Sequence, residues 1–252
     1  MLLGRMLRNL RGRDWFSVGV ELFVLVVGIV LGLQASDWAN ERRDRAEERD
    51  YLRRLLEDNT ANQAIVERGL GRNRHTAELA RSIADALATA DRQPDPDAMT
   101  TALCKWFVQP VLHLQRSTYA EMISSGKLLL LRDQRLRAQL AEEDAAHDEV
   151  HRLDVLIAPM ERAAQPLERH TRWYIDGSRG SADLSRGTAA CHFDVDGMRR
   201  DPDVQSALAQ AYRYEVLFAL FHERELKALA ATRDMLRAAL GEPETAPKPN
   251  AN

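Results

Sequence analysis

A continuous hydrophobic run covers residues 15–35, and densely charged sequence follows it. Glu21 is the one charged residue in this run, which otherwise consists mainly of aliphatic residues and glycine. As an α-helix the run would rise about 31 Å, close to the thickness of the hydrocarbon core of a bilayer. A cleaved signal peptide is the alternative, but its apolar core would be unusually long and Leu33-Gln34-Ala35 is a poor cleavage site. The pattern therefore predicts a transmembrane helix.

The helical pattern continues beyond the hydrophobic run. No glycine or proline occurs between Leu33 and Gly69, and strong helix formers fill this segment. Apolar residues recur at steps of three to four, interrupted by a polar interval around Asn59 and Asn62. The spacing predicts that the membrane helix extends as a stalk into the first helix of an extramembrane domain. That helix ends at the proline-containing break over residues 91–97.

Two shorter helices are predicted after the break. Asp95 and Pro96 are a typical N-cap and first residue for a helix that ends before Pro110. Thr118 and Glu121 have the spacing of a capping box at the start of the next short helix.

The last part of the chain predicts two long helices separated by a loop. One helix covers 133–174, with a kink at Pro159 or Pro166. Residues 176–200 contain four glycines and no helical period, which indicates an irregular loop. An aspartate, a proline and a second aspartate then begin a helix over 201–240.

The fold class expected from this pattern is all-α, with no internal repeat and no convincing strand pair. One N-terminal transmembrane helix continues into a stalk, and an extramembrane bundle contains about four longer helices. The predicted parts are a basic cytoplasmic N-terminus (1–14), a transmembrane helix (15–35), a helical extramembrane domain (36–241) and a disordered tail (242–252).

Charge and composition exclude one class of function. The net charge is −3, and both signs are interspersed along the chain after the hydrophobic run. A nucleic-acid-binding protein needs a clustered basic face, and aromatic residues that could stack on bases make up only 6% of the chain. We expect no nucleic-acid partner.

Arginines flank the predicted membrane helix on both sides. Before and after it lie Arg5, Arg8, Arg11, Arg13, Arg42, Arg43, Arg45 and Arg49. The positive-inside tally is therefore even, since acidic residues count little. Arg13 lies nearer the membrane edge than Arg42, and long downstream domains translocate largely regardless of charge. We expect the N-terminus inside and the large domain outside.

Five residues of the predicted membrane helix share one face at 100° per residue, namely Glu21, Leu25, Gly28, Gly32 and Ala35. The two glycines form a G-x-x-x-G spacing, which lets helix backbones approach closely. A charged Glu21 facing lipid would cost about 3 kcal/mol at the bilayer centre and less near the edge. We expect this stripe to face another protein helix, where two Glu21 carboxyl groups could share a proton or Ser17 of the partner could donate. A residue that reaches towards the headgroups and a proton relay are the alternatives.

The same residues carry a family resemblance. Glu21 and Gly28, followed by LGLQASDWANERRDRAEERDYL, resemble the start of a bacterial family of uncharacterised single-span membrane proteins. The matching positions are Glu21, Gly28, Leu33, Gln34, Trp38, Asn40 and Glu41. The segment SSGKLLLLRDQRLRAQL is also similar to a later part of the family, whereas Val20 replaces an expected glycine and Ala39 is an insertion. The resemblance implies a membrane anchor, a helical outer domain and no known activity. It favours a bacterial inner membrane, with the main domain in the periplasm.

His147 and His151 are candidates for metal chemistry. Their spacing is that of the two zinc ligands in the H-E-x-x-H helix. Asp148 stands where that motif has its glutamate and is one methylene shorter, and no third ligand is evident. The neighbouring acids and Arg152 favour a solvated, salt-bridged face instead. We expect no metal and no other cofactor.

A second metal candidate lies in residues 192–203. Asp194, Asp196 and Asp203 match positions 3, 5 and 12 of a calcium-binding loop. A histidine occupies position 1, and two arginines oppose a cation. A turn that leads into a capped helix explains the same residues.

The two cysteines leave two possibilities open. Cys104 and Cys191 could form a disulfide, which suits an oxidising compartment, or remain two buried thiols. Neither lies in a recognisable nucleophile motif.

These features predict a non-enzymatic bitopic membrane protein. Its helical domain acts as a structural or partner-binding subunit, and its transmembrane helix drives oligomerisation. The expected partners are the lipid bilayer and either a second copy or another membrane protein. One alternative is a metal-dependent hydrolase centred on His147 and His151. The other is a ligand-sensing domain that signals through a membrane partner.

Overall fold

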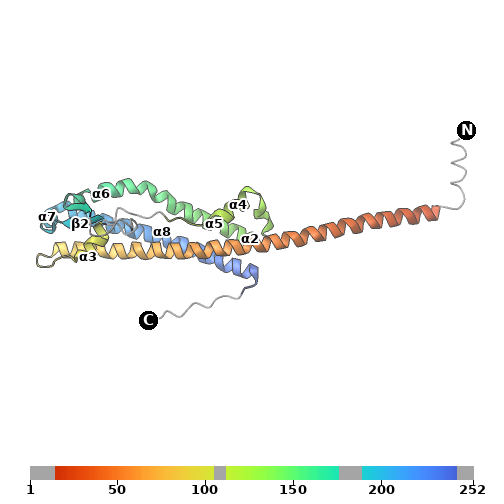
Figure 1. Ribbon diagram of the computed structural model, residues 1–252, viewed down its shortest axis with the longest axis horizontal. Helices are drawn as coiled ribbons and strands as arrows, with labels where there is room; N and C mark the ends of the chain where they lie inside the picture. The colour runs from red at the N-terminus through yellow and green to blue at the C-terminus, as the bar shows by residue number, and fades with distance from the viewer. Residues whose placement is uncertain (1–14, 105–111, 176–188, 243–252) are drawn as a thin grey trace, which may run out of the picture. The chain divides into compact units, whose positions relative to one another are not determined.

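The computed structural model describes residues 15–104, 112–175 and 189–242. The chain divides into two compact units, Met1–Tyr51 and Leu52–Asn252. Helix α2 (Trp15–Ala88) begins in the first unit and ends in the second (Figure 1). The prediction that the apolar helix continues without a break is confirmed.

The apolar segment of the first unit is exposed in the part of the chain that the structure describes. An 18-residue window of α2 reaches a mean hydropathy of 2.0, and none of it is buried. Phe23, for example, is 69% exposed. By length and composition this helix can cross a membrane. The predicted basic segment 1–14 lies outside the described residues.

The second unit is a helical bundle. Its long elements are residues 52–88 of α2, α5 (Gln134–His151), α6 (Ile157–Arg169) and α8 (Pro202–Leu240) (Figure 1). Helix α8 packs against both α5 and α6, and side-chain hydrogen bonds join α2 to α5 and α8. The prediction of an all-α fold built on a bundle of long helices is confirmed.

One end of the bundle has an apolar core. Buried side chains from α2, α6 and α8 meet there, including Ile83, Leu87, Met160, Leu167 and Leu208. Short elements close this end, namely α3 (Pro96–Met99), a π-helical turn (Thr100–Cys104) and α7 (Val195–Arg200).

The predicted helix caps are correct at two of three places. The carboxylate of Asp95 accepts a hydrogen bond from the Asp97 amide at 3.0 Å, and Asp201 caps α8 in the same way. Helix α4 (Ser117–Ser124) differs, because Thr118 lies inside the helix at 2% exposure and makes no cap. The predicted capping box is therefore wrong. The rest of the helix predicted to end before Pro110, residues 105–110, lies outside the described residues.

The predicted single helix over 133–174 is also wrong. Helix α5 ends at His151, and a 3-10 turn (Arg152–Leu156) separates it from α6. The break precedes Pro159, which lies in the first turn of α6, where a missing N–H loses no helical bond. Pro166 lies inside α6.

Two short strands correct the expectation of no strand pair. Strands β1 (Thr171–Ile175) and β2 (Ala189–Phe193) are antiparallel, with Trp173 opposite Cys191. Strand β2 and α7 occupy part of the predicted irregular loop 176–200, and its residues 176–188 lie outside the described part. The sequence TRWYI is rich in β-branched and aromatic residues, which suit a strand better than a helix end.

Candidate functional site

The predicted membrane-helix stripe is open along its length. Glu21, Leu25, Gly28, Gly32 and Ala35 are all exposed on α2. A Cβ atom added at Gly28 or Gly32 would meet no atom of the described residues within 4 Å. The stripe thus has the shape of a surface that another helix could approach closely.

The predicted zinc ligands are engaged in other contacts. The rings of His147 and His151 stack with their centroids 6.4 Å apart, and His147 Nδ1 lies 2.9 Å from Glu225 Oε1. Asp148 pairs with Arg116. Within 15–104, 112–175 and 189–242, no group of three or more histidine, cysteine or acidic side chains could hold a metal ion. The described residues therefore offer no third metal ligand beside His147 and His151 for the hydrolase alternative.

The predicted calcium ligands serve helix starts instead. Asp194 Oδ1 accepts a hydrogen bond from the Gly197 amide at 2.8 Å and caps α7. Asp196 lies in the first turn of α7, and Asp203 in the first turn of α8 pairs with Arg169 at 3.3 Å. The structure does not bring the three carboxylates together as a cation site.

The two cysteines form a disulfide. Cys104 ends the π-helical turn and Cys191 lies in β2, with their Cα atoms 6.0 Å apart. The bond ties the strand pair to the end of the bundle that holds the apolar core.

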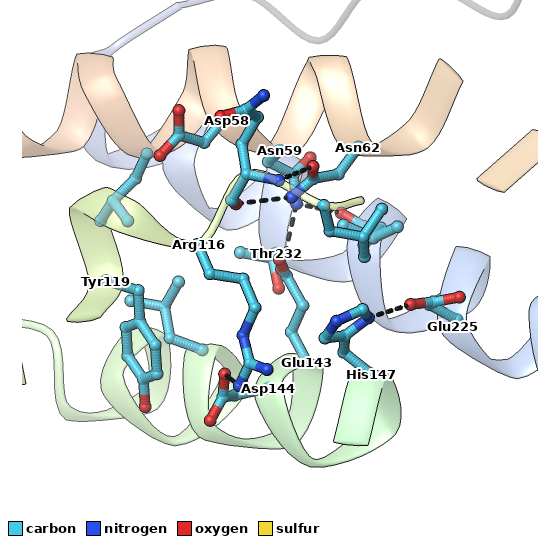
Figure 2. A pocket seen from close by; sticks show the side chains of 15 residues that line it. Asp58, Asn59, Asn62, Arg116, Tyr119, Glu143, Asp144, His147, Glu225 and Thr232 are labelled. Carbon is cyan, nitrogen blue, oxygen red and sulfur yellow. Dashed lines mark hydrogen bonds and ion pairs between the residues drawn. The ribbon is translucent and has the colours of Figure 1, made fainter. Parts of the chain in front are cut away.

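A buried polar network lies between α2, α5 and α8 (Figure 2), and the sequence alone did not show which residues form it. It surrounds a cavity of about 40 Å³. Six polar side chains that face this space are Asn59, Asn62, Arg116, Glu143, His147 and Glu225. A cavity of this size accommodates a few water molecules and no metabolite.

Two asparagines provide the contribution of α2. Asn59 Nδ2 donates hydrogen bonds to Glu143 Oε2 and to the Leu229 carbonyl, both at 3.0 Å. The Asn62 amide pairs in both directions with the backbone of Gln115, at 2.7 and 2.9 Å. Asparagine suits both places because its amide offers donors and an acceptor at once. The network therefore joins α2 to α5, to α8 and to the segment before α4.

Helix α8 contributes a carboxylate held between two histidines. Glu225 is 1% exposed, and its two oxygens lie 2.9 Å from His147 Nδ1 and 3.2 Å from His222 Nδ1. Burial alone would raise the pKa of Glu225. The hydrogen bonds from the two rings outweigh burial and hold this pKa below its ordinary value. The group is thus an ionised carboxylate inside the bundle.

The pKa of Glu143 on α5 is displaced in the opposite direction to that of Glu225. Burial raises the pKa of its carboxyl group above the ordinary value, and the nearby charges of Glu225 and Asp144 act in the same direction. Hydrogen bonds from Thr232 and Asn59 offset this effect only in part. Two carboxyl groups of one network therefore have pKa values displaced in opposite directions.

We expect Glu143→Gln to stabilise the protein at neutral pH. Because the folded-state pKa of Glu143 is raised, its protonated form contributes stability below the unfolded-state pKa. That contribution is lost as the pH rises through the folded-state pKa, where the buried group ionises. Glutamine keeps an oxygen for Asn59 Nδ2 and never ionises. Thermal unfolding followed by circular dichroism should show a rise of roughly 2–4 °C at pH 7, the shift that 1 kcal/mol gives in a domain of this size. The variants should converge at acid pH, and a lower Tm at pH 7 would contradict the expectation.

An ion-paired arginine lies on the α4 side of the cavity. Arg116 binds Asp144 and Asp148 on α5, the latter at 2.9 Å. Figure 2 shows Arg116 extending along the cavity towards Asp144. Asn59 Oδ1 and Asp58 Oδ2 are buried acceptors that have no hydrogen-bond partner among the described residues. Within that part of the chain, these two atoms beside the cavity can accept from a small donor such as water.

Part of this network had a visible signal in the sequence. The polar interval around Asn59 and Asn62 interrupts the apolar stripe, and such an interval inside a long helix points to a buried polar contact. The partners of these residues gave no signal, because Glu143 and Glu225 look like any charged residue on an amphipathic helix.

Comparisons of the chain with protein-family models, with curated proteins and with solved structures find no match. The resemblance to a family of single-span membrane proteins therefore stays a prediction.

Proposed function

We propose that this chain is a non-enzymatic, single-span membrane protein that acts as a structural or partner-binding subunit. Its membrane helix is proposed to drive oligomerisation. The observation that carries this proposal is the uncovered apolar segment of α2, where Glu21, Gly28 and Gly32 share one exposed face. A carboxyl group in an apolar segment favours a protein neighbour over lipid, and the glycines leave room for one.

We further propose a bacterial inner membrane as the location, with the N-terminus in the cytoplasm and the bundle in the periplasm. The disulfide between Cys104 and Cys191 supports this orientation, because disulfides persist in oxidising compartments and are rare in the cytosol. The even distribution of arginines around the span does not oppose it.

The buried polar network supports a structural role over ligand sensing. Its side chains mainly hydrogen-bond one another, and the cavity of about 40 Å³ is too small for a metabolite. Such a network fixes which helix faces meet and how far each helix is shifted along its neighbour.

The membrane-helix interface is tested by two glycine substitutions. We expect Gly28→Leu to weaken the oligomer about tenfold, since a leucine keeps the backbones apart and helix contacts of this kind contribute roughly 1–2 kcal/mol. Gly19→Leu is the matched control, because Gly19 lies on the opposite face of α2 and a Cβ atom there would also meet no described atom within 4 Å. The full chain in mild detergent should be measured by size exclusion with light scattering.

Glu21 gives an independent test of the same interface. Glu21→Leu should weaken the oligomer, whereas Glu21→Gln should retain much of it because the amide still forms hydrogen bonds. A monomer for the unmodified chain in several mild detergents, with no protein companion, would contradict the proposal.

A further inference from the structure

A groove runs between α5 and α8 on the second unit. It measures about 730 Å³, and its lining includes Ala145 and Ala146 from α5 and Ala228 and Ala231 from α8. Short side chains along a groove let a further helix pack at close range. This surface lies on other residues of α5 and α8 than the polar network does.

The two walls of the groove carry opposite charges. Glu142 and Glu149 line the α5 wall, whereas Arg224 and Lys227 line the α8 wall. Glu149 and Arg224 pair across the groove at 3.2 Å. Glu142 and Lys227 are exposed and make no ion pair in the part of the chain that the structure describes. Two opposite charges are therefore available to an occupant of the groove.

The direction of the two helices decides which occupant fits. Hydrogen bonds join Gln139 to Ala228, His147 to Glu225 and Glu149 to Arg224. The residue numbers of these contacts increase along α5 and decrease along α8. The helices are antiparallel. A two-fold axis along the groove would place α5 of one copy beside α8 of the other, and every neighbouring pair would again be antiparallel. This is the up-and-down arrangement of a four-helix bundle.

The same axis brings the acidic wall of each copy against the basic wall of the other. A two-fold rotation about an axis parallel to the helices does not shift any residue along that axis. Glu149 of one copy therefore lies opposite Arg224 of the other, as it does within one copy. Glu142 and Lys227 also face each other across the interface, within about one helical turn. The contact occurs twice because a two-fold interface is self-complementary.

We propose that the groove between α5 and α8 is the extramembrane part of a homodimer interface, occupied by the same groove of a second copy. This inference rests on the proposed self-association and names the surface that would contribute to it outside the membrane. Charge complementarity and the antiparallel geometry favour a second copy over an unrelated helix.

Charge reversal tests the groove in the full chain. Glu142→Lys or Lys227→Glu alone should raise the dimer dissociation constant roughly five- to tenfold, since each change occurs twice and sets like charges opposite each other. The double variant exchanges the two signs and should return to within about twofold of the unmodified chain. Glu67→Lys, an exposed reversal on α2 outside the groove, is the control. Failure of the double variant to recover would overturn the pairing.

Cross-linking separates this inference from the proposed function. Chains carrying Glu142→Cys are co-expressed with chains carrying Lys227→Cys, and a short bismaleimide is added to the membranes. Leu25→Cys reports on the membrane-helix stripe in parallel. A 142–227 product supports the groove dimer, with or without a product at Leu25. A product at Leu25 alone would overturn the groove dimer and leave the membrane-helix proposal standing. No product at either place, or a product only with a different protein, would overturn the groove dimer.

Discussion

Glu225→Leu is expected to lower the free energy of unfolding of the bundle by roughly 3–5 kcal/mol, because two buried ring N–H donors lose their acceptor and each buried unsatisfied donor costs about 1–3 kcal/mol. The carboxylate is 1% exposed and accepts from both His147 and His222. Leucine leaves both rings without their acceptor inside the bundle. Thermal unfolding followed by circular dichroism should show a fall in Tm of about 10 °C.

A matched substitution two residues away controls for the loss of a glutamate from α8. Glu223 forms an exposed ion pair with Arg74 at 2.7 Å, and such pairs contribute about 0–1 kcal/mol. Glu223→Leu should therefore change Tm little. If the two variants lost equal stability, the buried network would not be the source of the effect.

A combined variant tests whether the loss of stability arises because the two histidines have no hydrogen-bond acceptor. Replacing His147, His222 and Glu225 together by leucine removes the ionic group and its donors at once. Apolar replacement of a whole buried ionic cluster is often neutral or stabilising. The triple variant should therefore recover much of the stability lost in Glu225→Leu, which a general packing defect would not allow.

The pH dependence of this effect has a defined sign. Because the folded-state pKa of Glu225 is lowered, its contribution is complete above the unfolded-state pKa and is lost as pH falls through the folded-state value. The stability gap between the unmodified chain and Glu225→Gln should shrink as the pH falls below about 4.5. Measuring both in a Glu143→Gln background removes the opposing titration of that group.

Helices α2 and α8 were predictable because several local signals agreed along each of them. Helix α8 begins where an aspartate and a proline predict it, and its apolar period extends to Leu240. The strand pair was not predictable in the same way. One residue separates strand β1 from the end of α6, and 13 residues separate β1 from its partner β2. No short hairpin turn therefore marks the pair in the sequence.

The polar network shows a second limit of reasoning from one sequence. Asn59 and Glu143 are 84 positions apart, and His147 and Glu225 are 78 positions apart. Periodicity tells which face of a helix is apolar, but it does not tell which polar residues on different helices will meet. Glu225 lies among charged neighbours and looks solvent-exposed until the packing of α5 against α8 is known.

Loss of the disulfide should be the other large effect. In the chain-entropy model, a bond that closes a loop of 87 residues stabilises a protein by about 4–5 kcal/mol, and strain reduces this value. Cys104 is 6% exposed and lies next in sequence to Leu103 of the apolar core. The bond therefore connects β2 to the end of the bundle that holds the apolar core. Replacing both cysteines by alanine should lower Tm by about 10 °C.

Reductant separates the bond from the side chains that form it. Dithiothreitol should lower the Tm of the unmodified chain towards that of the Cys104→Ala/Cys191→Ala variant and should leave the variant unchanged. Thiol counting under denaturing conditions should find no free thiol before reduction and two afterwards. Two free thiols in protein taken directly from its native membrane would contradict the bond. They would also remove the main support for a periplasmic bundle, because the orientation would then rest on the flanking arginines alone.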